Sequence, residues 1–157
     1  MTATTRQALI TQLGGAMQAY QRSTQTFDDE VGRQLGLNPT DLRCLDWLVD
    51  ARRSARQLSE ATGLSSAATT TLIDRLERKG FVRRVPHDTD RRQVLVEITV
   101  EGRERVGRFY GPLVVEGAGM LDAYPKAQLQ VMLDYLLAIT ELTDRHRQAL
   151  RDGPARP

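Results

Sequence analysis

The sequence predicts a mainly α-helical protein of the α+β class, and three observations support that prediction. Long stretches near both ends place apolar residues three, four and seven positions apart, which is the period of an amphipathic helix. Between them, residues 55–79 have the pattern of two helices joined by a tight turn. Alternating segments at 81–85 and 94–99 then indicate two antiparallel strands. This order is that of a winged helix-turn-helix with a two-stranded β wing and flanking helices.

Length and composition exclude several classes of protein. A chain of 157 residues, 40% hydrophobic and 27% charged, suits a single globular domain. No apolar run approaches the ~18 residues of a membrane span, and the N-terminus lacks the pattern of a secretory signal. We therefore expect a cytoplasmic location and no membrane partner. The single cysteine, Cys44, excludes an intrachain disulfide and a thiolate cluster for zinc, and we expect no metal or other cofactor.

The first two helices are predicted from apolar spacing and from capping residues. Apolar residues keep helical spacing over 5–35, in one helix or in one interrupted near Asp28–Asp29. Asn38 followed by Pro39 is typical of an N-cap and first turn, so a second helix is expected to run to about residue 49. The residues expected to face inward on that helix are Leu42, Leu45, Trp47 and Leu48.

A helix-turn-helix is predicted after an Arg-rich connection at 51–54. Its first helix is expected at 55–62, and its second, capped by Ser65 or Ser66, at 66–79. Small and hydroxyl side chains near the start of the second helix allow close approach to a DNA groove and bonds to base edges or phosphates. Thr69–Thr71 are poor helix formers, so either function or tertiary packing must favour them. The residues expected to face the core are Ala68, Leu72, Ile73 and Leu76.

The loop at 86–92 between the two predicted strands is polar and is expected to project. An arginine at such a tip suits the narrow, negative minor groove of DNA, and Asp90 would then orient its guanidinium. The alternative is a solvated hairpin with a local ion pair. Residues 51–110 contain thirteen basic and eight acidic residues, a net charge of +5. This positive charge lies in the segment that is predicted to bind DNA, where it could neutralise phosphates.

Two further helices are expected after the wing. The first begins near Val100 and is weakened by Gly107, Gly111, Gly117 and Gly119, and we expect Pro112 to kink it. The second follows Pro125 and runs to about Leu150 with a strong apolar stripe. The long helix at residues 5–35 is too long to bury its stripe against a small winged helix alone, so a partner chain is expected. Residues 151–157 are expected to form a flexible tail.

Two motifs identify a family resemblance. They are LSEATGLSSAATTTLIDRLERKGFVRR and, after a gap, DRRQVLVEITVEG. With them, the segment from Leu37 to about Val106 resembles the MarR family of winged-helix transcriptional regulators, and the order of helices extends the resemblance to nearly the whole chain. It implies a homodimeric, sequence-specific, double-stranded-DNA-binding repressor on a near-palindromic operator. Residues 37–100 would form the DNA-binding lobe, and 1–36 with 101–150 the dimerisation helices.

The resemblance also implies roles for individual residues. Ser66, Thr69, Thr70 and Arg75 would contact the major groove or phosphates, Arg92 would enter the minor groove, and Asp90 would orient it. Ala67 and Asp88 stand where the family often has proline. The full set of candidate DNA-binding residues is Ser65, Ser66, Thr69, Thr70, Thr71, Arg75, Arg78, Asp90, Arg91 and Arg92.

A small-molecule effector is a further expectation from the resemblance. Many members bind phenolic or aromatic carboxylate ligands in a crevice between the dimerisation helices and the DNA-binding lobe, and the ligand releases the DNA. The residues that would line it here are Tyr20, Phe27, Arg43, Trp47 and Phe109. The alternative is that these are core or dimer-seam residues. Other relatives sense oxidants through a cysteine on the first helix, where this chain has none, and Cys44 is expected to be a buried structural thiol.

Two competing functions are disfavoured by the sequence. A winged-helix protein-interaction module without DNA binding would be free to lose Arg75, Arg91 and Arg92, and all three are present. An enzyme is disfavoured because the only histidines, His87 and His146, lie in a predicted wing tip and near a helix end. No catalytic grouping, glycine-rich phosphate loop or paired metal motif accompanies them.

Overall fold

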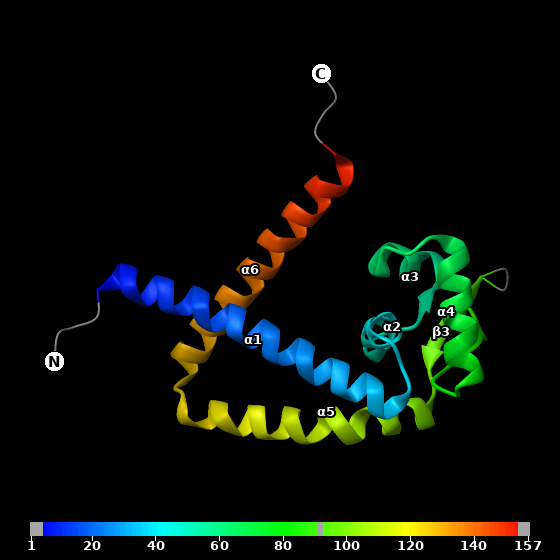
Figure 1. Ribbon diagram of the computed structural model, residues 1–157, viewed down its shortest axis with the longest axis horizontal. Helices are drawn as coiled ribbons and strands as arrows, with labels where there is room; N and C mark the ends of the chain where they lie inside the picture. Colours follow the sequence, from blue (N-terminus) through cyan, green and yellow to red (C-terminus); the bar gives the residue numbers. More distant parts are fainter. Residues whose placement is uncertain (1–4, 91–92, 154–157) are drawn as a thin grey trace. The chain divides into compact units, whose positions relative to one another are not determined.

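The computed structural model describes residues 5–90 and 93–153, which form six α-helices, one short 3-10 helix and one three-stranded sheet (Figure 1). The helices are α1 Arg6–Leu35, α2 Pro39–Val49, α3 Ala55–Thr62, α4 Ser66–Arg78, α5 Val100–Met120, η1 Leu121–Ala123 and α6 Lys126–Asp152. The strands are β1 Arg53–Ser54, β2 Val82–Pro86 and β3 Val94–Ile98. The chain divides into two compact units, Met1–Tyr110 and Gly111–Pro157.

Local capping signals explain why the first two helices begin and end where they do. Thr5 caps α1, its hydroxyl accepting from the backbone N–H of Ala8 at 3.2 Å, and α1 is one helix rather than two. Gly36 ends it in the left-handed region at φ 64°, where glycine meets no Cβ penalty. Asn38 and Asp41 form a reciprocal capping box at the start of α2. The predicted boundaries of both helices are confirmed, and the interruption near Asp28–Asp29 is wrong.

The sheet differs from the two-stranded ribbon that the sequence predicts. Strand β3 lies at its centre in the order β1-β3-β2, with both neighbours antiparallel. Arg53 of β1 pairs with Val96. The segment expected to be only a connection therefore contributes a third strand. Two residues are too few to show an alternating pattern, so only pairing with a distant partner identifies this strand.

The core of the first unit brings the end of α1 together with α2, α3, α4 and the sheet. Its buried members are Val31, Leu37, Leu42, Cys44, Leu45, Leu48, Leu58, Leu72, Ile73, Leu76, Phe81, Val82, Val96 and Ile98. Two predictions about this core need correction. Trp47 was expected to face inward and is 40% exposed. On α4 the sequence predicts that Ala68 faces the core, but Ala68 is only half-buried. Its neighbour Thr69 is buried instead and is 1% exposed.

The burial of Thr69 follows from helical spacing and from a satisfied hydroxyl. Thr69 lies three, four and seven residues before Leu72, Ile73 and Leu76, so the four share one face of α4. Its hydroxyl donates to the carbonyl oxygen of Ser65 at 2.9 Å, which removes most of the cost of burying a polar group. Tertiary packing therefore accounts for the first of the three consecutive threonines.

A close approach between α5 and the start of β2 joins that helix to the winged unit. The hydroxyl of Thr99 accepts from the backbone N–H of Gly102 at 2.8 Å and donates to the carbonyl oxygen of Gly80 at 2.7 Å. A Cβ atom on Gly102 would lie 2.4 Å from the carbonyl oxygen of Phe81. The helix can begin here because residue 102 has no side chain. Further along, α5 continues through Pro112, so the proline does not end it.

The second unit consists of the end of α5, η1 and α6. No described residue of α6 is buried. The exposed large apolar residues of that helix are Val131, Met132, Leu133, Tyr135, Leu136, Leu137, Leu142 and Leu150. The first half of α1, in the other unit, likewise exposes Leu9, Ile10 and Leu13. Among the described residues, no helix is both long enough and apolar enough to cross a membrane.

Cys44 lies in the core, as the sequence predicts. Its side chain is fully buried, and burial, with the charge of Asp41 as the second cause, raises the pKa of the thiol to about 12. The reactive species of cysteine is the thiolate, so a buried protonated thiol is inert.

Replacing Gly102 by alanine is expected to destabilise the protein by about 1–3 kcal/mol or more, because the new Cβ meets backbone atoms that have no free space to move into. Gly107→Ala on the same helix is the control: its Cβ meets no atom within 4 Å, and the change is expected to stabilise by about 0.5–1 kcal/mol. Urea unfolding of both variants measures the difference. Equal stabilities would contradict the close approach.

Alkylation of Cys44 is expected to be slow in the native protein at pH 8, with about a thousandfold less thiolate than an exposed cysteine has. In denaturant one equivalent of iodoacetamide should react, which mass spectrometry can follow. Because the unfolded thiol ionises first, the free energy of unfolding should also fall as pH rises from about 9 toward 12. Rapid native labelling would instead indicate an accessible, redox-capable cysteine.

Candidate nucleic-acid interface

Helix α4 is presented by a short turn that follows α3. Gly63 ends α3 in the left-handed region at φ 75°, and Ser65 caps α4 by accepting from the backbone N–H of Ala68 at 3.3 Å. Only the three residues Gly63, Leu64 and Ser65 separate the two helices, because each helix has its own terminal signal. Ser65, Ser66 and Ala67 at the start of α4 are exposed, and the N-terminal end of a helix suits an anionic partner.

The exposed face of α4 contains five of the predicted contacts, namely Ser65, Ser66, Thr70, Thr71 and Arg78. The hydroxyls of Thr70 and Thr71 donate to backbone carbonyls four residues earlier, at 3.0 and 3.1 Å. Their remaining capacity is to accept hydrogen bonds, and their methyl groups are available for apolar contact. Both properties match groups in the DNA major groove, the amino groups of adenine and cytosine and the methyl of thymine.

Two other predicted contacts on α4 do not lie on this face. Thr69 is buried, so its expected groove contact is wrong. The guanidinium of Arg75 is half-buried and donates from Nε and Nη2 to Oδ1 of Asp41, at 3.1 and 2.5 Å. Asp41 itself is 1% exposed. Arg75 therefore has a buried carboxylate as its partner, where the sequence predicted a phosphate or base.

The acidic residues of α4 are neutralised by strand β2. Arg84 forms ion pairs with Asp74, at 2.6 Å, and with Glu77. The hydrogen bond to Asp74 is the largest cause of a raised pKa for Arg84. Because these carboxylates have a cationic partner, they would repel a nearby phosphate less. Sequence reasoning missed this role of Arg84, and the DRLERKG motif gives no signal of it.

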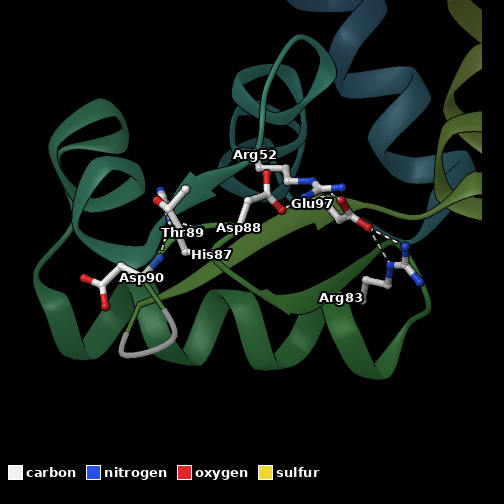
Figure 2. Close-up of polar contacts among 7 residues, drawn as sticks. All are labelled: Arg52, Arg83, His87, Asp88, Thr89, Asp90 and Glu97. Carbon is white, nitrogen blue, oxygen red and sulfur yellow. Dashed lines mark hydrogen bonds and ion pairs between the residues drawn. The ribbon is translucent and has the colours of Figure 1, made fainter.

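Ion pairs fix the base of the wing (Figure 2). The carboxylate of Glu97 on β3 forms two ion pairs. Its Oε2 lies 2.6 Å from Arg52 Nε, and its Oε1 lies 2.5 Å from Arg83 Nη2. The Arg83 hydrogen bond is the largest cause of a lowered pKa for Glu97, whose side chain is only 15% exposed. Arg52 also reaches Asp88 at 3.2 Å, so a single arginine links the sheet to the loop of the wing.

Hydrogen bonds to a histidine ring shape the turn before the wing tip (Figure 2). His87 Nδ1 accepts from the backbone N–H groups of Thr89, at 3.3 Å, and Asp90, at 3.2 Å. Directly before β3, the side chain of Gln93 donates to Asp90 Oδ2 at 2.9 Å. Arg91 and Arg92 lie outside the described residues. The predicted pairing of Asp90 with Arg92 therefore stays a prediction.

The five predicted ligand-lining residues do not share one environment. Phe27 and Phe109 are half-buried and pack against the core. Tyr20 is 71% exposed, Arg43 is exposed, and Trp47 is covered on one side by the guanidinium of Arg53, 5.2 Å from the ring centroid. None of the five lines the surface hollow found on α6, which is bounded by Leu137, Thr140, Glu141, Asp144, Arg145, Arg147 and Gln148.

Tyr110, which the sequence did not single out, organises the surroundings of Phe27. The two rings meet edge to face, with centroids 5.4 Å apart, and the Tyr110 hydroxyl donates to Asp28 at 2.7 Å. Burial, followed by Asp28, raises the pKa of Tyr110. Burial, followed by the charges of Asp28 and Asp50, likewise raises the pKa of Asp46. This environment is acidic and disfavours a bound carboxylate.

Metal chemistry has no visible basis in this arrangement. Across residues 5–90 and 93–153, no three His, Cys, Asp or Glu side chains gather in a group that would hold an ion. The arrangement instead offers hydroxyl, methyl and guanidinium groups on a helix next to a projecting loop.

Comparisons with known proteins agree with this geometry. A family model described as MarR family matches residues 35–93. The HTH-type transcriptional regulator YcgE of Bacillus subtilis (strain 168) is 28% identical over 129 residues, 82% of this chain and 84% of the relative. A MarR family protein from Bacillus stearothermophilus has the same fold, with a TM-score of 0.65 and 19% identity over 89% of this chain and 99% of that one.

A third similar protein was solved with a nucleic acid. It is a mutant of MepR from S. aureus bound to an oligodeoxyribonucleotide, with a TM-score of 0.55 and 15% identity over 83% of this chain and 97% of that one. At that identity the likeness concerns the fold alone. Taken with the helix-turn-helix and the charged wing, the family model over residues 35–93 and the similar regulator identify the winged helix-turn-helix of this chain as one of the MarR type, a family whose transcriptional regulators bind DNA and are not enzymes.

Proposed function

We propose that the protein is a dimeric, sequence-specific repressor on a near-palindromic operator. The observation that best supports this is the exposed face of α4, where Ser66, Thr70 and Thr71 offer acceptors and methyl groups at the start of a helix. Side chains this small allow the helix backbone to lie close to base edges. The oligodeoxyribonucleotide bound by MepR supports DNA as the partner of this fold.

Phosphate binding is assigned to the ends of α4. Ser65 and Ser66 lie at its N-terminus, where backbone N–H groups and the helix dipole attract an anion. Arg78 lies in its last turn and is exposed, with Nε donating only to the carbonyl oxygen of Asp74, at 3.3 Å, among the contacts described. A backbone carbonyl carries no net charge and does not neutralise Arg78, so the positive charge of Arg78 remains available to a phosphate.

The wing is assigned to the minor groove, with Arg92 as the inserted residue and Asp90 as the acid that orients it. Arg91 would reach a neighbouring phosphate. Asp90 donates its backbone N–H to His87 Nδ1 and accepts from the side chain of Gln93, and these hydrogen bonds support the assignment because they hold Asp90 in place directly before the two arginines. Narrow minor grooves attract arginine through their enhanced negative potential.

Dimerisation is assigned to residues 1–36 and 101–150, and DNA binding to residues 37–100. The exposed apolar residues of α1 and of α6 support this division, because amphipathic helices that expose their apolar residues are typical of interaction surfaces. Two copies related by a twofold axis present two copies of α4, which is why the operator should be near-palindromic.

Release by a small molecule completes the proposal. A ligand acts by preferring one separation of the two α4 helices over another. The acidic surroundings of Asp28 and Asp46 favour a neutral phenol over an aromatic carboxylate. Phe27 and Tyr110 would supply the aromatic contact.

DNA binding is tested by fluorescence anisotropy with DNA from upstream of the protein's own gene. Wild-type protein should prefer it over scrambled DNA, and log Kd should vary with log salt concentration. Arg92→Ala should weaken specific binding by about 1–3 kcal/mol, and Arg78→Ala should reduce the salt slope by about 0.9.

The control for this experiment is Arg147→Ala, an exposed arginine of α6 already paired with Asp144 at 3.0 Å, and its Kd should match that of wild type. Absence of sequence-preferring, salt-sensitive binding by the wild-type protein would overturn the proposal and favour a protein-interaction module.

Dimerisation is tested by sedimentation equilibrium. Leu136→Glu places a carboxylate on the apolar face of α6 and should weaken the dimer by more than about tenfold, because an unpaired charge would be buried. Ala138→Glu adds the same carboxylate about 200° around the helix and should leave the dimer intact. If both variants remain dimeric, α6 is not part of the interface.

A further inference from the structure

We propose that Asp41 is a positioning residue for DNA recognition, which sets the pose of α4 through its ion pair with Arg75. This inference rests on the proposed DNA-binding role of α4. The Asp41–Arg75 pair then serves to orient α4 within the protein, and Arg75 is not itself a DNA contact.

Asp41 uses both carboxylate oxygens inside the protein. Oδ2 accepts from the backbone N–H of Asn38 at 3.1 Å, which completes the cap of α2. Oδ1 accepts from Nε and Nη2 of Arg75. One buried side chain therefore joins the start of α2 to the middle of α4, across 34 positions of sequence.

A second contact ties the end of α4 to the same junction. Lys79, the C-cap of α4, donates from Nζ to the carbonyl oxygen of Gly36, the residue that ends α1. The junction from Gly36 to Asp41 thus holds α4 at two points, one helical turn apart. Together with the buried face of α4, these two attachments restrain rotation of the helix about its axis.

Rotation of α4 matters because it decides which side chains meet the bases. A small turn would move Thr70 and Thr71 relative to the groove and bring other residues of α4 forward. Base contacts depend on that alignment, whereas charge attraction to phosphates does not. Loss of the pair is therefore expected to reduce specificity while it leaves the electrostatic part of binding intact.

Arg75 could either position α4 or contact a phosphate, and the geometry of its guanidinium distinguishes these two roles. Arg75 offers two donors in a fixed plane to one buried oxygen, and lysine has the same charge without that fork. A residue that only neutralises phosphate should tolerate lysine. A residue that positions α4 should not.

The experiment compares Arg75→Lys and Asp41→Asn with wild type by anisotropy, on operator DNA and on scrambled DNA, over a series of salt concentrations. Circular dichroism and thermal melting establish that each variant is folded at the assay temperature. Arg75→Lys keeps the charge opposite Asp41, so it provides the test if Asp41→Asn fails to fold. Arg78→Ala is the matched control for loss of a phosphate contact on the same helix.

We expect both variants to bind the operator about tenfold more weakly, to keep their affinity for scrambled DNA within about twofold, and to retain the wild-type salt slope. Arg78→Ala should instead weaken binding to both DNAs and reduce the slope by about 0.9.

Two outcomes would overturn the inference while leaving the proposed function in place. If folded variants bind both DNAs as wild type does, the pair is only structural. If the affinities for operator and scrambled DNA fall by the same factor, the pair supports binding in general and not the alignment of α4 with the bases. Failure of the wild-type protein to prefer its operator would overturn the proposed function, and the inference with it.

Discussion

The DNA-binding unit depends on the buried ion pair between Asp41 and Arg75. A carboxylate out of contact with water is costly unless a cation and hydrogen-bond donors surround it. Asp41 meets this requirement with one backbone N–H and one guanidinium, which come from different helices. Leaving Asp41 without Arg75 would bury an unpaired carboxylate, so the pair favours one placement of α4 relative to α2. The buried face of α4, formed by Thr69, Leu72, Ile73 and Leu76, supports the same placement.

Charge in this unit is largely used within the protein. The net +5 of residues 51–110 indicates the correct region for a polyanion, but most of its arginines have internal partners. Arg52 and Arg83 converge on Glu97, and Arg84 neutralises two acids of α4. These pairs stabilise the sheet and the approach of β2 to α4, and exposed ones contribute little energy singly. The count of basic residues thus overstates the number available to DNA.

Different parts of the chain also differ in how much of their apolar surface is buried. The first unit buries a continuous core from Val31 to Ile98, which is enough to define the winged helix. Helix α6 and the first half of α1 have the spacing of amphipathic helices and yet expose their apolar residues. A helix of this pattern is stabilised mainly by packing, since its local propensity is weak in isolation. The same amphipathic pattern thus accompanies burial in one part of the chain and exposure in another.

The sequence by itself determined the helix boundaries, their caps and the two wing strands, because these depend on residues within a few positions of one another. Thr5, Asn38, Ser54 and Ser65 cap helices through bonds to residues three positions away. Only the tertiary structure decided that β1 exists, that Thr69 rather than Ala68 is buried, that Trp47 is exposed and that Arg75 meets Asp41. Each depends on contacts between segments far apart in the chain. No local pattern encodes which distant group will complete the hydrogen bonds of a buried carboxylate.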